Sequence, residues 1–268
     1  MSSIIVSDAL DFLRELPDAS VPLFLFSPPY NLGTSSGGGI HAYGHYATDA
    51  GMKKRGGLAK WSNAKLADGY GDYDDAMPPA EYMAWQKTIL AECWRCLPEN
   101  GAIYYVHKPR VQGGVCQTPL DFNPGHLIVR QIVIWNRMGG FNWNPTAYCP
   151  MHEWIVVFAK LDFRLRNKSA SVCGDVWTIP HSAGRAANSW HPAPFPLALA
   201  ERVIETTMPT LCCDPFSGSG TTAQACKRLG VEFIGCDRNA DYVARALREL
   251  EDVQPYEQAL LPTQAVLL

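Results

Sequence analysis

Two short segments of the chain carry residue types whose spacing could support chemistry. Residues 27–30 read Ser-Pro-Pro-Tyr, and residues 214–222 read Asp-Pro-Phe-Ser-Gly-Ser-Gly-Thr-Thr. In the second segment, glycines that permit a tight turn lie between a short apolar stretch and a helix that we expect to begin at Thr221. Because the N–H groups and the positive dipole end of such a helix attract an anionic or polar ligand, the segment predicts a binding site for one.

The surroundings of this glycine turn narrow the class of ligand. No lysine follows the glycines, so the segment lacks the phosphate-binding pattern of a P-loop. Residues 231–237 are typical of a second buried strand that ends at Asp237, about twenty residues on, where a Rossmann-like unit places the acid that binds ribose hydroxyls. We therefore expect a nucleoside without a triphosphate.

Both segments closely resemble motifs of the amino-directed DNA methyltransferases that use S-adenosyl-L-methionine, in the permuted (beta) order in which the catalytic tetrapeptide precedes the cofactor loop. The resemblance also extends over residues 4–31, 97–106, 132–160 and 191–246. It implies a Rossmann-like α/β fold with a doubly wound, mostly parallel sheet. It further implies methyl transfer to the exocyclic amino group of a flipped cytosine (N4) or adenine (N6) in double-stranded DNA.

The tetrapeptide has groups that suit such a transfer. An exocyclic amine is a poor nucleophile because its lone pair is delocalised into the ring, and two acceptors, the Ser27 hydroxyl and the Pro28 carbonyl, can favour a more tetrahedral nitrogen. The prolines fix φ and orient that carbonyl. The Tyr30 ring can stack on an extruded base, so a phenylalanine there is expected to keep most activity. A plain Pro-Pro turn after a buried strand is the alternative. The predicted catalytic residues are Ser27, Pro28, Pro29 and Tyr30.

By resemblance, residues from several segments bind S-adenosyl-L-methionine. Asp8 and Ala9 match a position that contacts the cofactor adenine, although Asp8 could equally cap the first expected helix. Phe195 is expected to wall the adenine pocket, although the Thr-Gln-Lys usual in that segment is missing, and His191 is as readily a structural hydrogen-bonding residue. The predicted cofactor-binding residues are Asp8, Ala9, Phe195, Asp214, Phe216, Ser217, Gly218, Ser219, Gly220, Thr221 and Asp237.

The features that distinguish the two target bases disagree. By resemblance, serine at position 27 is more frequent in N4-cytosine enzymes, whereas aspartate is more frequent in N6-adenine ones. The Asn-Leu-Gly of residues 31–33 resembles the adenine branch at least as much. Residues 135–136 and 152–154 resemble blocks that shape the base pocket, and core packing explains their tryptophans nearly as well. The target base therefore stays open.

Apolar patterns predict alternating strands and helices, which is typical of a mostly parallel sheet covered on both faces. The strand expected at residues 21–26 leads directly into Ser27, so the tetrapeptide should lie at the carboxyl end of a strand, where open α/β sheets bind ligands. Further strands are expected at 101–106, 132–135, 154–159, 211–213 and 231–237, and helices at 8–16, 81–97, 196–206, 221–229 and 240–250.

Length and composition favour a single methyltransferase domain over residues 1–268, because 268 residues with 47% hydrophobic content can bury one substantial core. Residues 31–78 are rich in glycine and poor in aliphatic residues, so we expect a long mobile loop there. Residues 161–190 are a candidate for a short target-recognition region. Within it, residues 167–169 and 185–188 could reach base edges.

The charge and the cysteine content limit which binding partners and which cellular compartment the sequence favours. The net charge of −3 does not exclude DNA binding, because basic clusters at residues 53–60, 108–110 and 164–168 could contact phosphates or be ordinary solvated surface. The nine cysteines suit reduced thiols, and Cys93 and Cys96 lack a second pair at zinc-site spacing, so no metal is expected. We expect a cytoplasmic monomer or homodimer without a membrane segment. Its expected partners are double-stranded DNA and, where it is paired with one, a cognate restriction endonuclease.

Other function classes fit the motifs less well. RNA or protein methyltransferases with a related Pro-Pro-Tyr usually have the cofactor loop first. A non-catalytic DNA-binding homologue would lose one of the two motifs, whereas both are intact here. Cytosine C5 methylation needs an activated cysteine after a proline, but Val115 precedes Cys116 and the motif order is wrong.

Overall fold

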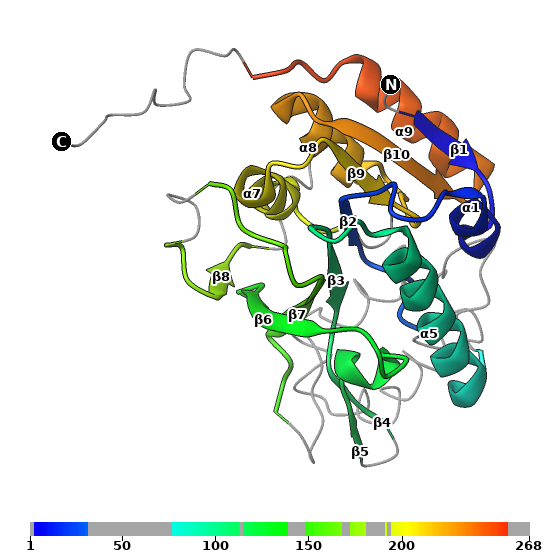
Figure 1. Cartoon of the computed structure of the whole chain (residues 1–268), viewed down its shortest axis with the longest axis vertical. Coiled ribbons are helices and arrows are strands. Elements are labelled where there is room, and N and C mark those ends of the chain that lie inside the picture. The colour runs from blue at the N-terminus through cyan, green and yellow to red at the C-terminus, as the bar shows by residue number, and fades with distance from the viewer. Residues whose placement is uncertain are drawn as a thin grey trace, which may run out of the picture.

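An eight-stranded sheet forms the centre of the molecule (Figure 1). The computed structural model describes residues 3–31, 77–112, 115–138, 148–167, 172–180, 191 and 194–256. From one edge of the sheet to the other, the strands are β1 (Ser3–Val6), β10 (Glu232–Asp237), β9 (Leu211–Asp214), β2 (Leu23–Phe26), β3 (Ala102–His107), β7 (His152–Ala159), β6 (Val129–Asn136) and β8 (Val176–Thr178).

Strand direction decides which residues meet at the ends of this sheet. β1, β10, β9, β2 and β3 are mutually parallel, β7 runs antiparallel to both β3 and β6, and β8 is parallel to β6. The amino end of β7 therefore lies on the same side of the sheet as the carboxyl ends of the other strands, directly beside those of β3 and β6. A separate ladder of β4 (Arg110–Gln112) and β5 (Val115–Gln117), followed by a short 3-10 helix (Pro119–Phe122), comes directly after β3.

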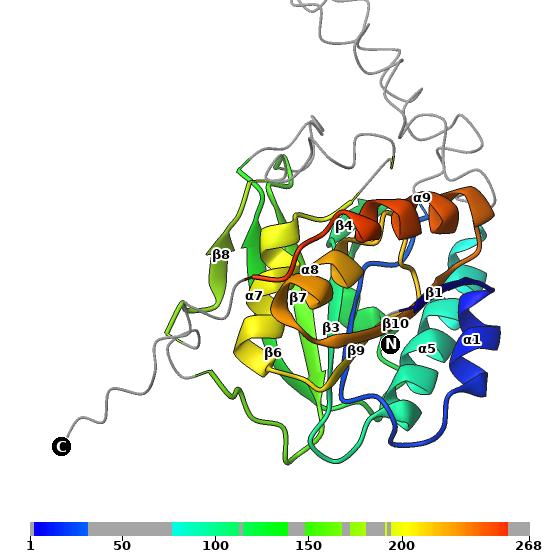
Figure 2. The same cartoon turned by 90° about the horizontal axis from the view of Figure 1, so that it is seen from above.

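Helices cover both faces of the sheet (Figures 1 and 2). α1 (Ala9–Glu15) and α5 (Pro79–Cys96) pack on one face, and α7 (Leu197–Thr207), α8 (Thr221–Leu229) and α9 (Ala240–Glu251) pack on the other. All the side chains of β2 are buried, as expected of a strand that is covered on both sides. These layers confirm the predicted doubly wound, mostly parallel α/β fold.

Local signals set where the helices begin and end. The Asp8 carboxylate accepts a hydrogen bond from the Leu10 N–H (2.9 Å), and the Asn239 side-chain oxygen accepts one from the Tyr242 N–H (3.0 Å), so these residues cap α1 and α9. α8 ends at Gly230, whose φ of 68° is readily adopted only by glycine. Within the described ranges, no helix has the length and apolar character needed to cross a membrane.

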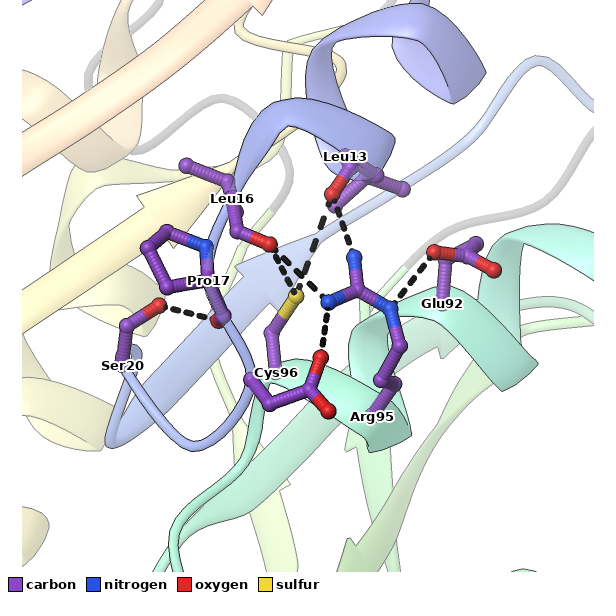
Figure 3. A network of polar contacts seen from close by, with 8 residues as sticks. Leu13, Leu16, Pro17, Ser20, Glu92, Arg95 and Cys96 are labelled. Atoms are coloured by element: carbon purple, nitrogen blue, oxygen red, sulfur yellow. Dashed lines mark hydrogen bonds and ion pairs between the residues drawn. The ribbon is translucent and has the colours of Figure 1, made fainter.

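One arginine fastens α1 to α5 (Figure 3). The Arg95 guanidinium donates to the carbonyl oxygens of Leu13 (2.8 Å) and Leu16 (2.9 Å) at the end of α1, where the Leu13 carbonyl also accepts a hydrogen bond from the Leu16 N–H (3.2 Å). It also pairs with the carboxylates of Asp18 and Glu92. This contact fixes the chain shortly before β2, the strand that leads into the tetrapeptide.

The observed elements start and end within a few residues of the predicted ones, and the differences have a physical reason. β1, β4, β5 and β8 are not predicted, because each has only three or four residues, and β1, β5 and β8 carry mostly exposed side chains. β8 lies within 161–190 and joins the sheet beside β6.

Several predicted segments lie outside the described residues. Of the loop expected at 31–78, residues 32–76 are not described. Residues 168–171 and 181–190 are also outside the described part of the chain, and with them most of the candidate base-contacting residues of the recognition region. The mobile loop and the recognition region stay predictions.

Candidate active site

Two adjacent strands bring the two sequence motifs together. β2 pairs in parallel with β9, with Phe24 opposite Cys213. Both strands end on the same side of the sheet, so the tetrapeptide at 27–30 and the glycine turn at 214–220 leave neighbouring strand ends. The Thr222 hydroxyl, at the start of α8, lies 3.4 Å from the carbonyl oxygen of Leu25 and so links α8 directly to β2.

Asp214 braces the glycine turn from inside. Its carboxylate is buried and accepts hydrogen bonds from the Phe216 N–H (2.9 Å) and from the Thr222 hydroxyl (2.8 Å). Burial raises the pKa of this carboxyl to about 7, although the two hydrogen bonds act in the opposite direction. The Ser217 hydroxyl donates to the Asp214 carbonyl (2.9 Å). Asp214 therefore shapes the turn, and its predicted contact with a cofactor stays a prediction.

Three glycines allow the turn to lie close to its neighbours. Gly218 and Gly220 have φ values of 47° and 75°, a region that favours glycine. A Cβ on Gly235, in β10, would lie 2.5 Å from the carbonyl oxygen of Asp214, so the turn packs against bare backbone. A Cβ on Gly218 would lie 2.6 Å from the Nε2 atom of His191.

The carboxylate of Asp237 joins the glycine turn to the end of β10. It accepts hydrogen bonds from the Gly218 N–H (2.8 Å) and from the Asn239 N–H (2.9 Å). The sequence places a ribose-binding acid at this strand end, and the structure puts the carboxylate of Asp237 directly beside the turn. Its contact with a ribose remains a prediction.

The other predicted cofactor residues come from both layers of the fold. Asp8 lies beside Asp237, because Val6 pairs with Asp237 across β1 and β10 and the Ser7 N–H donates to the Asp237 carbonyl (3.1 Å). The capping role of Asp8 is observed, while its contact with an adenine is not tested. The remaining residues are Ala9, which is buried on the α1 side, Phe195, which packs against the α7–α9 layer, and Ser219 and Thr221, whose buried hydroxyls lie 3.1 Å apart.

Three aromatic contacts place His191 and Phe216 at the borders of the glycine turn. The His191 ring packs edge to face on Tyr242 of α9 (5.0 Å between centroids), and burial lowers the pKa of this imidazole to about 4. The Phe216 ring lies 5.7 Å from that of Phe26 and 5.6 Å from that of Trp85. Phe216 therefore bridges the turn to the strand and helix on the other face.

The hydroxyl groups of the tetrapeptide form a chain of hydrogen bonds. The Ser27 hydroxyl donates to the Tyr30 hydroxyl (2.9 Å), which donates to Oε2 of Glu153 (2.7 Å). The Tyr30 ring packs on the ring of His107, with 4.3 Å between centroids. The sequence interpretation used only the ring of Tyr30, so the engagement of its hydroxyl is a new observation.

Glu153 and Arg137 form a buried ion pair beside this chain. Glu153 is at the amino end of β7, and Arg137 comes directly after β6. The Arg137 guanidinium donates to Oε1 of Glu153 (3.1 Å) and to the Pro150 carbonyl (2.8 Å). Because β7 runs against its neighbours, its first residues reach the strand ends where the tetrapeptide lies.

A second group of polar residues supports the prolines. The Tyr82 hydroxyl lies 2.7 Å from the Pro29 carbonyl oxygen and 3.0 Å from Nε2 of His107. Burial lowers the pKa of His107 to about 3, so its ring is neutral at pH 7.

Arg110 holds the chain that follows the tetrapeptide. Its guanidinium donates to the carbonyl oxygens of Tyr30 (2.7 Å) and Asn31 (2.9 Å), and its Nε donates to Gln117 (2.9 Å). Asn31 has a left-handed φ of 54°. The basic clusters at residues 108–110 and 164–168 could contact phosphates or be solvated surface. In them, Arg110 binds backbone, as does Arg164, which donates to two nearby carbonyls (both 2.7 Å).

Sequence reasoning from residue types did not find several polar residues of this site. Their common signal is that each lies at or just beyond a strand end on the ligand-binding side, or faces it from a helix. Glu153 was singled out only within a segment identified by resemblance, and Arg110 only within a basic cluster. These residues are Tyr82, His107, Arg110, Arg137 and Glu153.

Comparison with known proteins agrees with this geometry. Residues 21–248 match the family model described as DNA methylase, of the N6/N4 type. The type II methyltransferase M.BglII of Bacillus subtilis is 26% identical over 279 residues, covering 91% of this chain and 67% of that protein. The type II methyltransferase M.HinfI of Haemophilus influenzae is 26% identical over 278 residues, covering 95% of this chain and 70% of that protein.

Solved structures share the fold at lower sequence identity. The cytosine-N4-specific PvuII DNA methyltransferase is 16% identical with a TM-score of 0.64, and the match covers 94% of this chain and 90% of that one. The family model spans most of the sequence and includes both motifs, whose residues lie together at neighbouring strand ends. The chain therefore belongs to the N6/N4 family of DNA methylases.

Proposed function

We propose that this protein transfers a methyl group from S-adenosyl-L-methionine to the exocyclic amino group of a cytosine (N4) or an adenine (N6) in double-stranded DNA. One observation carries the proposal: the Ser27 tetrapeptide and the glycine turn leave adjacent parallel strands of a sheet that belongs to a DNA methylase family. The description of the matching family, DNA methylase, supports DNA as the substrate.

The residues around the glycine turn fit the proposed cofactor. The close approach that Gly218 and Gly235 permit suits a ligand held against backbone, and the carboxylate of Asp237 suits ribose hydroxyls. Phe216, in the turn, and Phe195, which packs against the α7–α9 layer, offer apolar surface for an adenine. A Thermus thermophilus protein described as a proposed DNA modification methylase shares the fold, and its structure is a complex with S-adenosyl-L-methionine. The two chains are 20% identical with a TM-score of 0.61, and the match covers 97% of this chain and 99% of that one. When bound, the cofactor supplies a methyl group on a positively charged sulfur.

The tetrapeptide prepares the amine that receives this methyl group. Ser27 and the Pro28 carbonyl accept hydrogen bonds from the two amine hydrogens, which withdraws the nitrogen lone pair from the ring and directs it outward. The base must leave the duplex to reach these groups. Positioning supplies much of the rate, and the surplus proton leaves to solvent after transfer. Ser27, Pro28, Pro29 and Tyr30 are the proposed catalytic residues.

Direct product analysis tests the proposal. The protein is incubated with unmethylated double-stranded DNA and S-adenosyl-L-methionine labelled in the methyl group, and the DNA is then digested to nucleosides. We expect label in N4-methylcytosine or in N6-methyladenine, which also identifies the base. Label that enters RNA or protein substrates and never DNA would contradict the proposal, as would binding of the cofactor without any transfer.

The wider setting of this activity is part of the same proposal. The type II names of the relatives are compatible with a modification enzyme that protects sites from a cognate restriction endonuclease. We propose a cytoplasmic enzyme that acts as a monomer or a homodimer. Digestion of methylated and unmethylated DNA with a panel of restriction endonucleases measures the protection of sites. Light scattering measures whether the protein is a monomer or a homodimer.

A further inference from the structure

The hydrogen bonds that start at Ser27 run in one direction and end on a buried carboxylate. Ser27 donates to Tyr30, and Tyr30 donates to Oε2 of Glu153. Arg137 donates to the second oxygen, Oε1, at 3.1 Å. Glu153 is only 6% exposed, so these protein groups, and not bulk water, determine its contacts.

The chemistry of a carboxylate fixes this direction. An ionised carboxylate only accepts hydrogen bonds, and Oε2 of Glu153 lies 2.7 Å from the Tyr30 hydroxyl, whereas a second acceptor, the Val106 carbonyl oxygen, is 3.4 Å away. The Tyr30 hydroxyl therefore gives its single hydrogen to Glu153. The Tyr30 oxygen then accepts the single hydrogen of Ser27. A serine hydroxyl whose hydrogen is committed in this way presents only lone pairs to any other partner.

We infer that Glu153, acting through Tyr30, is a positioning residue that keeps the Ser27 hydroxyl an acceptor for the target amine. This inference rests on the proposed function. The amine attacks with its nitrogen lone pair, and a Ser27 hydrogen pointing at that nitrogen would compete for the same lone pair. An accepting Ser27 oxygen binds an amine hydrogen and leaves the lone pair free for the methyl group. Arg137 fixes Glu153 for this task and compensates its charge.

Two substitutions change the direction of the hydrogen bonds with little change of shape. Tyr30→Phe keeps the ring and releases the Ser27 hydrogen. Glu153→Gln keeps the side-chain length, but Arg137 is expected to select the amide oxygen and turn the amide N–H groups toward Tyr30. In both variants we expect the single-turnover rate of methyl transfer to fall roughly 10-fold to 100-fold, the range of one charge-assisted hydrogen bond. For Tyr30→Phe this loss replaces the retained activity that stacking by the ring alone predicts, because the Tyr30 hydroxyl is engaged by Ser27 and Glu153. DNA and cofactor dissociation constants should stay within about 2-fold, because the interaction matters only as the amine reacts.

A double-mutant cycle separates this role from a merely structural one. If Glu153 acts through the Ser27 hydroxyl, Glu153→Gln should cost little further rate in a Ser27→Ala background, and so should Tyr30→Phe. Ser27→Ala alone is expected to lower the transfer rate with little effect on either affinity. A structural defect would lower the rate by the same factor in both backgrounds.

The chain contains a matched control away from the site. Tyr256 donates to Oε1 of Glu201 (2.7 Å), and Arg228 donates to the same oxygen (3.2 Å), which repeats the Tyr–Glu–Arg arrangement at the end of α8 opposite the glycine turn. Glu201→Gln and Tyr256→Phe should therefore leave the methyl-transfer rate unchanged. The free energies of unfolding of these two variants measure the contribution of the Tyr256–Glu201–Arg228 contacts to stability.

The outcomes distinguish the two proposals. The role of Glu153 would be overturned if Glu153→Gln lowered the rate by the same factor in the Ser27→Ala background as in the wild type, or if it lowered DNA affinity as much as the rate. Either result would leave the methyltransferase proposal intact. A folded wild-type protein that transfers no methyl group to DNA would contradict the proposed function and with it this inference. Thermal unfolding of each variant identifies any that fails to fold, and Tyr30→Phe then replaces Glu153→Gln in the cycle.

Discussion

The Ser27 hydroxyl, which we propose accepts an amine hydrogen of the substrate, is oriented through the Tyr30 hydroxyl by a residue distant in the sequence. A serine hydroxyl can donate or accept, so its residue type alone does not define its role. The contact from Tyr30 to Glu153 spans 123 residues of the chain and removes this ambiguity. At the residue scale, the chemistry of the site therefore belongs to a group of side chains and not to the tetrapeptide alone.

Asp237 offers a direct test of the cofactor site. Its carboxylate contacts the glycine turn at the position where a ribose is expected, so Asp237→Ala should weaken S-adenosyl-L-methionine binding by roughly 1–3 kcal/mol, the usual loss for hydrogen bonds to a charged group. Isothermal titration calorimetry measures the affinity. Asp241→Ala, an exposed residue in the first turn of α9, is the control and should bind as the wild type does. Equal affinities for all three proteins would remove Asp237 from the cofactor site.

At the scale of elements, the packing of the glycine turn on β10 can be tested at Gly235. A methyl group there would lie 2.5 Å from the Asp214 carbonyl oxygen, so Gly235→Ala must displace the turn. We expect a loss of roughly 1–3 kcal/mol in the free energy of unfolding, as for other overpacked cores, together with weaker cofactor binding.

Gly230→Ala is the matched control for this prediction. Gly230 ends α8 with a φ of 68°, and no atom lies within 4 Å of its added methyl group. This variant should lose about 1 kcal/mol of stability through backbone strain and keep full cofactor affinity. If both glycine variants bind the cofactor equally well, the close packing of the turn is not needed for the site.

The contact between α1 and α5 is also a property of elements. Arg95 donates to two carbonyls at the end of α1 and pairs with two carboxylates, so Arg95→Ala should lower the free energy of unfolding by roughly 1–3 kcal/mol (Figure 3). Arg14→Ala breaks only an exposed pair with Asp11 and should cost less than about 0.5 kcal/mol. Urea denaturation measures both. Equal losses would show that Arg95 contributes no more than a surface charge.

At the scale of the whole molecule, burial of Asp214 makes stability depend on pH. The pKa of Asp214 is about 7 in the folded protein, against an ordinary value of 3.8, so between these values the folded chain holds a proton that the unfolded chain releases. The contribution of this group to the free energy of unfolding therefore falls as pH rises from about 4 to about 7. From the pKa difference the fall is on the order of 4 kcal/mol.

Comparison with Asp214→Asn isolates this contribution. The asparagine keeps an oxygen for the Phe216 N–H and carries no titrating proton, while other groups, among them the buried His107 and His191, titrate in both proteins. Urea denaturation of both proteins from pH 4 to pH 8 should show the wild type losing stability relative to the variant as pH rises. Parallel stability profiles would contradict the raised pKa.

The sequence by itself determined the fold class and the location of both motifs. Apolar runs such as residues 23–26 and 233–236 mark strands that are covered by helices, and the glycines of residues 218–220 mark a turn that other residues adopt poorly. In a parallel sheet, strand ends collect at one side, so a residue directly after a strand is placed there by sequence order alone. This is why Ser27, Asp214 and Asp237 could be predicted as neighbours.

Only the tertiary structure decided how the polar groups of the site are connected. The antiparallel course of β7 brings Glu153 to strand ends that sequence order assigns to other segments, and the pairing of β6 with β7 places Arg137 beside it. Hydrogen bonds between residues far apart in the chain depend on side-chain distances, which neither periodicity nor residue type encodes. The use of Asp214 inside the turn, and of the Tyr30 hydroxyl between Ser27 and Glu153, follows from those distances.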